Sequence, residues 1–479
     1  MPYESTFNAI DDILRKEAGC SNELDYIEQT SWLLFLKYLD DLETELEMAA
    51  ELQGTDYRRI ITGFNRWSAW AAPKTAKGEL DVINAMTGDD LVTFVNTRLF
   101  PSLAKFKDTA ADTSSLEYKI GEIFSELRNK IQSGYNMRDI INKVDDLHFQ
   151  SADDKHEMSV LYEGRIQRMG NAGRNGGEYY TPRPLIRSIV QVVNPRIGET
   201  VYDPACGSAG FLCEAFNYMN GQVSSIADYD TLQHHTFYAR EKKLLPYIIA
   251  IMNMILHGIQ APNITRGNTL TLNMSQVMEK DRHHVILANP PFGGSERTEV
   301  QQNFDIATSE TAYMFMQHFV KMLKAGGRAG IVIKNTFLSN GDASALRKML
   351  IEKCNLHTVL DLPSGVFTGA GVKTVVLFFD KGTPTKRVWY YQVDKHFTKT
   401  APLTEADMED FLSKQRTQEE SENSWSIDVS DLDENYDLSV KNPNKVEEVD
   451  ERTPREILQE LQALNEENAA LLKELEGMV

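Results

Sequence analysis

Cysteine is scarce in this chain, and long apolar runs are absent. The 4 cysteines, Cys20, Cys206, Cys213 and Cys354, form no Cys-x-x-Cys pair, so neither a zinc site nor a disulfide framework is indicated. No segment reaches the roughly 18 consecutive apolar residues of a membrane span. The first residues carry acids where a secretory signal would carry a basic head. We therefore expect a reduced, cytoplasmic protein without a membrane segment.

Basic residues are also outnumbered. The 479 residues include 70 Asp and Glu against 50 Lys and Arg, which gives a formal net charge of −20. Because nucleic-acid affinity depends largely on Lys and Arg that neutralise phosphates, a chain this acidic should repel DNA overall. If DNA is the substrate, a local basic cluster or a partner protein has to supply the positive surface.

What is present is a globular composition, with 42% hydrophobic and 25% charged residues in a chain too long for one ordinary core. Residues 1–155 predict a helical N-terminal domain that contacts a partner or DNA. Apolar positions recur there at helical spacing, from Phe7 to Leu14 and again from Trp32 to Leu39. Trp67 and Trp70 could face a partner, but packing in the core is the favoured interpretation.

Residues 156–400 change to short β-rich runs that alternate with amphipathic helices. The strand-like runs are residues 199–204, 283–291, 328–335, 356–363, 373–380 and 387–393. Helical stretches lie between several of them, at residues 247–256, 311–323 and 343–353. This alternation predicts the α/β class, with a mainly parallel, Rossmann-like doubly wound sheet covered by helices on both faces. Ligands bind beyond the carboxyl ends of the strands in such sheets.

Residues 401–479 read as an acidic linker followed by a helix. The stretch 401–450 is rich in Asp and Glu, and a solvated linker is the preferred interpretation. A capping box from Thr453 to Glu456 then starts a helix. Its seam residues follow at alternating four- and three-residue steps: Ile457, Leu461, Leu464, Asn468, Leu471 and Leu475. This narrow stripe predicts a coiled-coil-like contact with a partner helix, and a helix folded back on its own protein is the alternative.

The strongest chemical signal is Asn289-Pro290-Pro291-Phe292, directly after the strand-like residues 283–288. An exocyclic amine such as adenine N6 is a poor nucleophile, because its lone pair is delocalised into the ring. The Asn289 side-chain oxygen and the Pro290 carbonyl could accept its hydrogens and free that lone pair. Pro291 would stiffen the turn, and Phe292 would stack on a base flipped out of a duplex. The alternative is a tight strand-end turn with an aromatic plug.

A second motif starts at Asp203, directly after another strand-like run. It continues with small residues, Gly207, Ser208, Ala209 and Gly210. Small residues let the backbone approach a ligand closely, and the N-terminus of the following helix favours negative groups. Asp203 supplies an acceptor for a ligand with an amino-acid end and a sulfonium. Cys206 within the motif is interpreted as a packing residue rather than a nucleophile.

With these motifs in this order, residues 178–380 resemble the DNA adenine N6-methyltransferases with an Asn-Pro-Pro-Phe active site. They resemble more closely the modification (methyltransferase) subunit of type I restriction–modification systems, whose helical head and tail this chain also matches. The resemblance implies that residues 156–400 form an S-adenosylmethionine-dependent catalytic domain in which Asn289, Pro290, Pro291 and Phe292 are catalytic. The residues that it places around the cofactor are Glu178, Tyr179, Tyr180, Thr181, Pro182, Arg183, Asp203, Gly207, Ser208, Ala209, Gly210, Glu241 and Asn268.

Some of these assignments also have a local reason. Thr181 can cap the helix that Pro182 begins, which would expose amide donors to a carboxylate. Glu241 matches the acidic residue with which such enzymes grip the ribose hydroxyls. Asn268 departs from the family, because many relatives carry Asp there beside the adenine ring, although an amide can also accept or donate.

The implied reaction is direct transfer of a methyl group to adenine N6 in double-stranded DNA, with the adenine flipped out. No metal is expected, since the histidines stand as adjacent pairs rather than at ligand spacing. The chain lacks an obvious base-reading region, so the resemblance implies a separate specificity subunit bound by two copies of this chain, and a restriction subunit in the larger complex. Two alternatives stay open: a methyltransferase for a glutamine of release factors, and a catalytically silent assembly protein.

Overall fold

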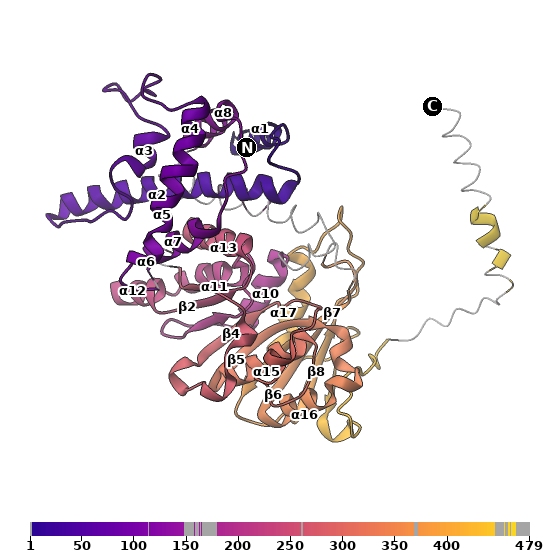
Figure 1. Cartoon of the computed structure of the whole chain (residues 1–479). Coiled ribbons are helices and arrows are strands. Elements are labelled where there is room, and N and C mark those ends of the chain that lie inside the picture. The colour runs from indigo at the N-terminus through magenta and orange to yellow at the C-terminus, as the bar shows by residue number, and fades with distance from the viewer. Residues whose placement is uncertain are drawn as a thin grey trace. The chain divides into compact units, whose positions relative to one another are not determined.

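The structure is a computed structural model that describes residues 2–113, 115–147, 180–259, 262–367 and 372–445, with separate positions between 158 and 164 and between 455 and 465. The chain divides into two compact units, Met1–Val440 and Lys441–Val479. In Figure 1 the first unit begins with helices and continues into a sheet covered by further helices. None of the helices within the described ranges is long and apolar enough to cross a membrane.

The N-terminal part of the chain is helical, as predicted from its apolar spacing. Phe7 and Leu14 are buried in its core. Its longest helix begins after Asn22, whose side chain accepts a hydrogen bond from the amide of Asp25, and ends at Gly54 in the left-handed conformation. The helices are α1 (Pro2–Leu14), α2 (Glu23–Gln53), α3 (Trp67–Trp70), α4 (Gly88–Phe94), α5 (Phe100–Ala104), α6 (Phe106–Thr109), α7 (Leu116–Glu126) and α8 (Gly134–Asp145).

Two tryptophans of this part lie in the core. Trp67 and Trp70 are 3% and 0% exposed, and their rings meet edge to face with 5.5 Å between centroids. Core packing, rather than contact with a partner, is therefore their role in this chain.

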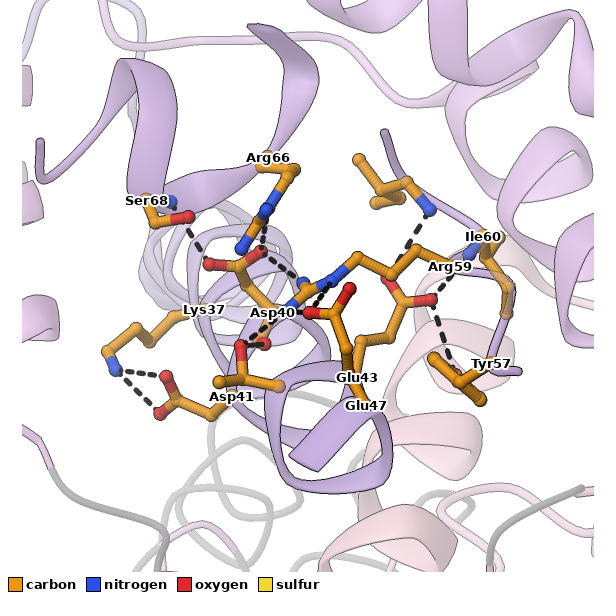
Figure 2. Close-up of polar contacts among 12 residues, drawn as sticks. Lys37, Asp40, Asp41, Glu43, Glu47, Tyr57, Arg59, Ile60, Arg66 and Ser68 are labelled. Atoms are coloured by element: carbon orange, nitrogen blue, oxygen red, sulfur yellow. Dashed lines mark hydrogen bonds and ion pairs between the residues drawn. The ribbon is translucent and has the colours of Figure 1, made fainter. Parts of the chain in front are cut away.

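A buried network of charged side chains fixes the segment after α2 on that helix, as Figure 2 shows. Asp40 accepts hydrogen bonds from Arg59 at 3.2 Å and from the backbone amide of Ser68 at 3.1 Å. Glu43, 1% exposed, accepts from the backbone amide of Ile60. Because a buried carboxylate is tolerated only when it is paired, these contacts lock the segment in one position.

Among the described residues, nine strands form one sheet in the order β3-β2-β1-β4-β5-β7-β6-β8-β9. They are β1 (Val201–Asp203), β2 (Phe237–Glu241), β3 (Ile264–Arg266), β4 (His283–Ala288), β5 (Leu323–Lys334), β6 (Cys354–Leu362), β7 (Thr374–Lys381), β8 (Arg387–Gln392) and β9 (Ser424–Asp428). Strands β1 to β5 pair in parallel, whereas β7 runs antiparallel to both neighbours and β9 to β8. The predicted fold class is confirmed.

Helices cover both faces of the sheet (Figure 1). Alternate residues of β4 show why, since Val285 and Leu287 join one hydrophobic core and Ile286 and Ala288 join the other. A strand buried on both faces reads as a continuous apolar run, which is how it was found. The core that contains Val285 also contains the N-terminal helices. The helices of the strand-rich part are α10 (Arg183–Val193), α11 (Gly210–Asn220), α12 (Ile226–His234), α13 (Leu244–Leu256), α14 (Thr298–Gln301), α15 (Thr311–Met322), α16 (Ser344–Lys353) and α17 (Glu409–Gln415).

The prediction of a solvated linker over residues 401–450 is wrong as far as Val440. Helix α17 lies in this stretch, and β9 extends the sheet beside β8. Phe411 and Trp425 are 0% and 4% exposed. The acidic residues occupy solvent-facing positions, while a few widely spaced apolar residues anchor the segment, so its average composition hid its packing.

The predicted C-terminal helix falls only partly on described residues. Positions 461–465 are helical, and Leu461 and Leu464 are 52% and 50% exposed. The other residues of the predicted capping box and seam lie outside the described residues: Thr453, Pro454, Glu456, Ile457, Asn468, Leu471 and Leu475.

Candidate active site

Both motifs of the sequence lie where the winding of the sheet reverses. β1 and β4 are parallel neighbours, with β2 and β3 beyond β1 and with β5 beyond β4. In open α/β sheets, ligand sites form outside the carboxyl ends of the strands at this point. Asp203 ends β1 and Asn289 follows β4, so the sheet brings the two motifs together.

Asn289 is held in one orientation by Thr181. The Asn289 amide nitrogen donates to the Thr181 hydroxyl at 3.0 Å. The side-chain oxygen Oδ1 of Asn289 is buried and has no hydrogen-bond partner in the part of the chain that the structure describes. An unsatisfied buried acceptor costs about 1–3 kcal/mol. The site therefore presents an acceptor that a donor on a ligand would satisfy.

Two cavities meet at Asn289, which lines both of them. The large cavity, of about 300 Å³, is bounded by the loops after β2, β3 and β4 and includes Glu241, Asn268, Pro291 and Glu296. The small cavity, of about 20 Å³, lies between the start of α10 and the loop after β1. Together they give an elongated ligand two compartments with one shared wall.

The loop after β1 forms one wall of the small cavity and depends on small residues. Gly207 and Ala209 adopt left-handed conformations, with φ of 53° and 61°. The side chain of Asn253, on α13, donates to the Ser208 carbonyl at 2.8 Å. This contact fixes the backbone just before α11 begins. It could not be predicted from the sequence, because the two residues are distant in the chain.

The segment before α10 lines the small cavity with Arg183, whose Nη1 donates to the Gly210 carbonyl at 2.6 Å. The prediction that Thr181 caps the helix is wrong, since α10 begins at Arg183 and its N-cap, Pro182, makes no side-chain hydrogen bond. A cap at Thr181 would need the amide of the second or third helical residue, and Pro184, the third, has none. The Thr181 hydroxyl turns to the active-site asparagine instead.

Two carboxyl groups end the neighbouring strands β1 and β2, that of Asp203 buried and that of Glu241 half-buried. Asp203, 1% exposed, accepts from the amide of Ala205 at 3.1 Å, and burial, together with repulsion from Glu241, raises its pKa to about 8. Glu241 accepts from the amides of Gly207 at 3.0 Å and Lys243 at 2.8 Å, and burial raises its pKa as well. A positively charged ligand would stabilise the ionised form of both groups.

At the far end of the large cavity, Glu296 joins two loops. Its Oε1 accepts from Lys242 Nζ at 3.0 Å and from Asn268 Nδ2 at 3.1 Å. The side-chain oxygen of Asn268 accepts from the amide of Leu270 at 3.1 Å. Asn268 was predicted from the sequence, whereas Glu296 and Lys242 were not, because nothing in their local sequence distinguishes them from surface residues.

The remaining residues of the Asn-Pro-Pro-Phe motif differ in their surroundings. Pro291 lines the large cavity. Phe292 is 7% exposed and meets Phe367 edge to face, with 5.3 Å between ring centroids. Phe292 and Pro290 line neither of these cavities, so the stacking of a base on Phe292 stays a prediction.

The structure thus gathers most of the predicted site residues on the walls of the two cavities: Tyr180, Thr181, Arg183, Asp203, Gly207, Ser208, Gly210, Glu241, Asn268, Asn289 and Pro291. Pro182 and Ala209 are not among the residues that line these two cavities. Glu178 and Tyr179 lie outside the described residues. Cys206 lines the small cavity as a buried thiol, and burial raises its pKa well above the ordinary value, which suits packing rather than nucleophilic attack.

Among the described residues, no group of three or more His, Cys, Asp and Glu side chains could hold a metal ion. The polar groups that line the cavities include carboxylates, lysine side chains, hydroxyl groups, an oriented asparagine and the Arg183 guanidinium.

Comparison with sequence families gives two matches. The model of the family described as N-6 DNA Methylase matches residues 153–452. The model described as HsdM N-terminal domain matches residues 4–161. The first match covers the sheet, both cavities and the segment that contains α17 and β9.

Similar proteins align with most or all of this chain. The EcoEI methylase subunit of a type I restriction enzyme from Escherichia coli is 36% identical over 504 aligned residues, which cover 100% of this chain and 98% of that protein. A modification subunit of a putative type I restriction enzyme from Vibrio vulnificus has a similar structure, with a TM-score of 0.82, 34% identity and coverage of 92% of this chain and 96% of that one. A chain from a structural study of complex assembly in the type I R-M system superposes with a TM-score of 0.80 at 36% identity, covering 98% and 97%.

Proposed function

The chain belongs to the N-6 DNA methylase family, as a methylase subunit of a type I restriction–modification system, and we propose that its two cavities hold S-adenosylmethionine while Asn289 grips the reacting amine. The enzyme is an adenine-specific DNA methyltransferase. Neither alternative left open by the sequence, a release-factor methyltransferase or a silent assembly protein, finds support among the relatives.

The residues at the cavities fit S-adenosylmethionine. Its cationic groups, an ammonium and a sulfonium, suit the carboxyl groups of Asp203 and Glu241, because burial raises the pKa of both groups and a cationic ligand would offset the cost of ionising them. Tyr180, Thr181 and Arg183 offer donors for the carboxylate of the amino-acid end. The large cavity has the room that a nucleoside needs, and the small cavity does not.

The single observation that carries the proposal is the unpartnered Oδ1 of Asn289 at the junction of the two cavities. When bound, the cofactor supplies a methyl group that its sulfonium has already activated. Asn289 Oδ1 and the Pro290 carbonyl accept hydrogen bonds from the N6 amino group of adenine. These bonds draw the nitrogen toward tetrahedral geometry and expose its lone pair. Because Thr181 fixes the amide beforehand, this acceptor requires no reorganisation during the reaction.

Recognition of DNA requires partners. The net charge of −20 disfavours binding to phosphates by this chain alone. A specificity subunit therefore supplies the base-reading surface, two copies of this chain bind to it, and a restriction subunit completes the assembly. The half-exposed Leu461 and Leu464 in the C-terminal helical segment support a contact of that segment with a partner helix. The target adenine is flipped out of the duplex, because a paired base is inaccessible to the active site.

The test is the Asn289→Ala variant, assembled with its specificity subunit. Methyl transfer to DNA should fall by at least about 100-fold, the scale of losing an oriented acceptor at the reacting atom. Binding of S-adenosylhomocysteine, measured by calorimetry, should change little. Asn220→Ala, at the exposed end of α11, is the matched control and should keep full activity. Near-normal turnover of Asn289→Ala would refute the assignment.

A further inference from the structure

The backbone of Glu296 is fixed in the wall of the large cavity. Its amide donates to the Ser309 carbonyl at 3.3 Å, and the Gln301 side chain donates to the Glu296 carbonyl at 2.8 Å. The neighbouring residue Ser295 pairs with Glu310 in an isolated antiparallel bridge. These backbone contacts therefore fix the position of Glu296, although it lies in a loop.

The side chain of Glu296 is equally constrained, but only through one of its oxygens. Oε1 accepts from Lys242 and Asn268, at 3.0 and 3.1 Å. No hydrogen bond within the described part of the chain involves Oε2, although the side chain is only 13% exposed and lines the cavity. A carboxylate in this state offers its second oxygen to a donor on a ligand.

Asn268 is less suited to that role. Its Nδ2 donates to Glu296, and its Oδ1 already accepts from the amide of Leu270 at 3.1 Å. Rotation of the amide would break both bonds. Between the two side chains, the ionised carboxylate is also the stronger acceptor, because hydrogen bonds to charged groups are about twice as strong as neutral ones.

We propose that Glu296 selects the 6-amino group of the cofactor's adenine ring, accepting its hydrogen on Oε2. The inference rests on the proposed function, which puts the nucleoside in the large cavity beside Glu241. Lys242 and Asn268 orient the carboxylate through their hydrogen bonds to Oε1. A 6-oxo purine would place a carbonyl oxygen against this carboxylate and be rejected.

Binding of two ligands to the full-length chain without DNA tests this assignment. The ligands are S-adenosylhomocysteine and S-inosylhomocysteine, which differ in having an amino or an oxo group at position 6. Wild-type protein should prefer the adenosyl ligand by about 100-fold or more, since a site built for an N–H donor leaves buried groups unpaired with the wrong partner. In Glu296→Gln the amide can donate to the oxo group, so the preference should fall below about 10-fold.

An exchange of acid and amide gives the sharper experiment. The double variant Asn268→Asp/Glu296→Gln keeps one carboxylate and one carboxamide but moves the carboxylate to position 268, and it should recover a preference for the amino ligand. Glu299→Gln, on the exposed first turn of α14, is the matched control and should behave as wild type. If Glu296→Gln fails to unfold cooperatively, Glu296→Asp, which withdraws the carboxylate from the ligand, replaces it and should also lose discrimination.

The possible failures are distinguishable. Wild-type protein that binds neither ligand would contradict the proposed cofactor site itself. Wild-type protein that binds and discriminates, with Glu296→Gln equally selective, would overturn the role of Glu296 alone. Because no DNA is present, a role of Glu296 toward the target adenine would leave the ligand preference unchanged and would likewise overturn the proposal.

Discussion

The Thr181 hydroxyl accepts a hydrogen bond from the Asn289 amide nitrogen at 3.0 Å, across the boundary between the segment before α10 and the end of β4. This bond decides which end of the amide points away from Thr181. It leaves Oδ1 as the unsatisfied atom at the junction of the two cavities. The orientation of Asn289 thus depends on a residue far from it in the chain.

Replacement of Thr181 by Val should impair turnover more than binding. Valine keeps the shape of the side chain but removes the acceptor, so the Asn289 amide is free to rotate and to present its NH2 group. We expect kcat of the assembled enzyme to fall by roughly 10- to 100-fold, since about 1.4 kcal/mol corresponds to a factor of ten. Thr181→Ser keeps the hydroxyl and should remain active; equal turnover of Thr181→Val would show that the bond is dispensable.

Cofactor affinity should rise with pH up to about 8. Asp203 has a pKa of about 8 because burial disfavours its charge, so it is largely protonated at pH 6. The ammonium of S-adenosylhomocysteine favours the ionised form, and binding should strengthen as pH increases toward this pKa and then level off. In Asp203→Asn the rise should be much weaker. Since Glu241 also has a raised pKa, a residual slope in this variant is expected; calorimetry between pH 6 and about 8 measures both profiles.

The unliganded protein should show the opposite dependence of stability on pH. The folded-state pKa of Asp203 lies above its ordinary value of 3.8, so its contribution to stability is present at low pH and is lost as pH rises through about 8. At pH 8 to about 9, Asp203→Asn should therefore melt at a higher temperature than wild type without ligand. A lower melting temperature of the variant throughout this range would contradict the buried, unpaired state of the carboxyl group.

Gly210→Ala should weaken cofactor binding. A Cβ at this position would lie 3.0 Å from Arg183 Nη1 and 3.0 Å from Ile186 Cδ1, so the guanidinium would have to move from the wall of the small cavity. We expect the Kd for S-adenosylhomocysteine to increase by about 10-fold, as one charge-assisted contact is lost. Gly221→Ala, just past the end of the same helix and with its nearest neighbour at 3.6 Å, should bind normally.

The network in Figure 2 should be a large contributor to the stability of the helical part. Asp40→Asn leaves the buried Arg59 without part of its charge partner and weakens the hold on Ser68. Breaking a buried pair typically costs about 3–5 kcal/mol of unfolding free energy. Asp12→Asn removes an exposed pair with Arg15 and should cost less than about 1 kcal/mol, which denaturant titration can resolve.

The sequence predicted those elements whose apolar pattern is strong. The runs around Val285 and Ile331 are buried on both faces and stand out as strands. β2 and β3 were missed, because β3 has only 3 residues and β2 ends in the charged residues Arg240 and Glu241, of which Glu241 lines the large cavity. Polarity at the carboxyl end of a strand is the normal consequence of building a ligand site there.

The candidate site was predictable where its residues belong to short contiguous motifs. Asn289 and Asp203 belong to short motifs and were found, and their common location followed from the topology. Glu296 and Asn253 act through partners that only the fold brings near, so no local pattern identifies them. The predicted helix-capping role of Thr181 was wrong, because its hydroxyl accepts a hydrogen bond from Asn289, which follows β4.

The position of β9 has a practical consequence for C-terminal truncation of this protein. Truncation at residue 400 would remove β9 and leave β8, which is rich in aromatic residues, as an edge strand open to pairing with other molecules. Tyr390 would lose the stacked ring of Trp425, 5.2 Å away, and the carbonyl of Leu438 that its hydroxyl contacts at 3.0 Å. A protein truncated at residue 400 should aggregate on expression, whereas one that ends after residue 440 should not aggregate.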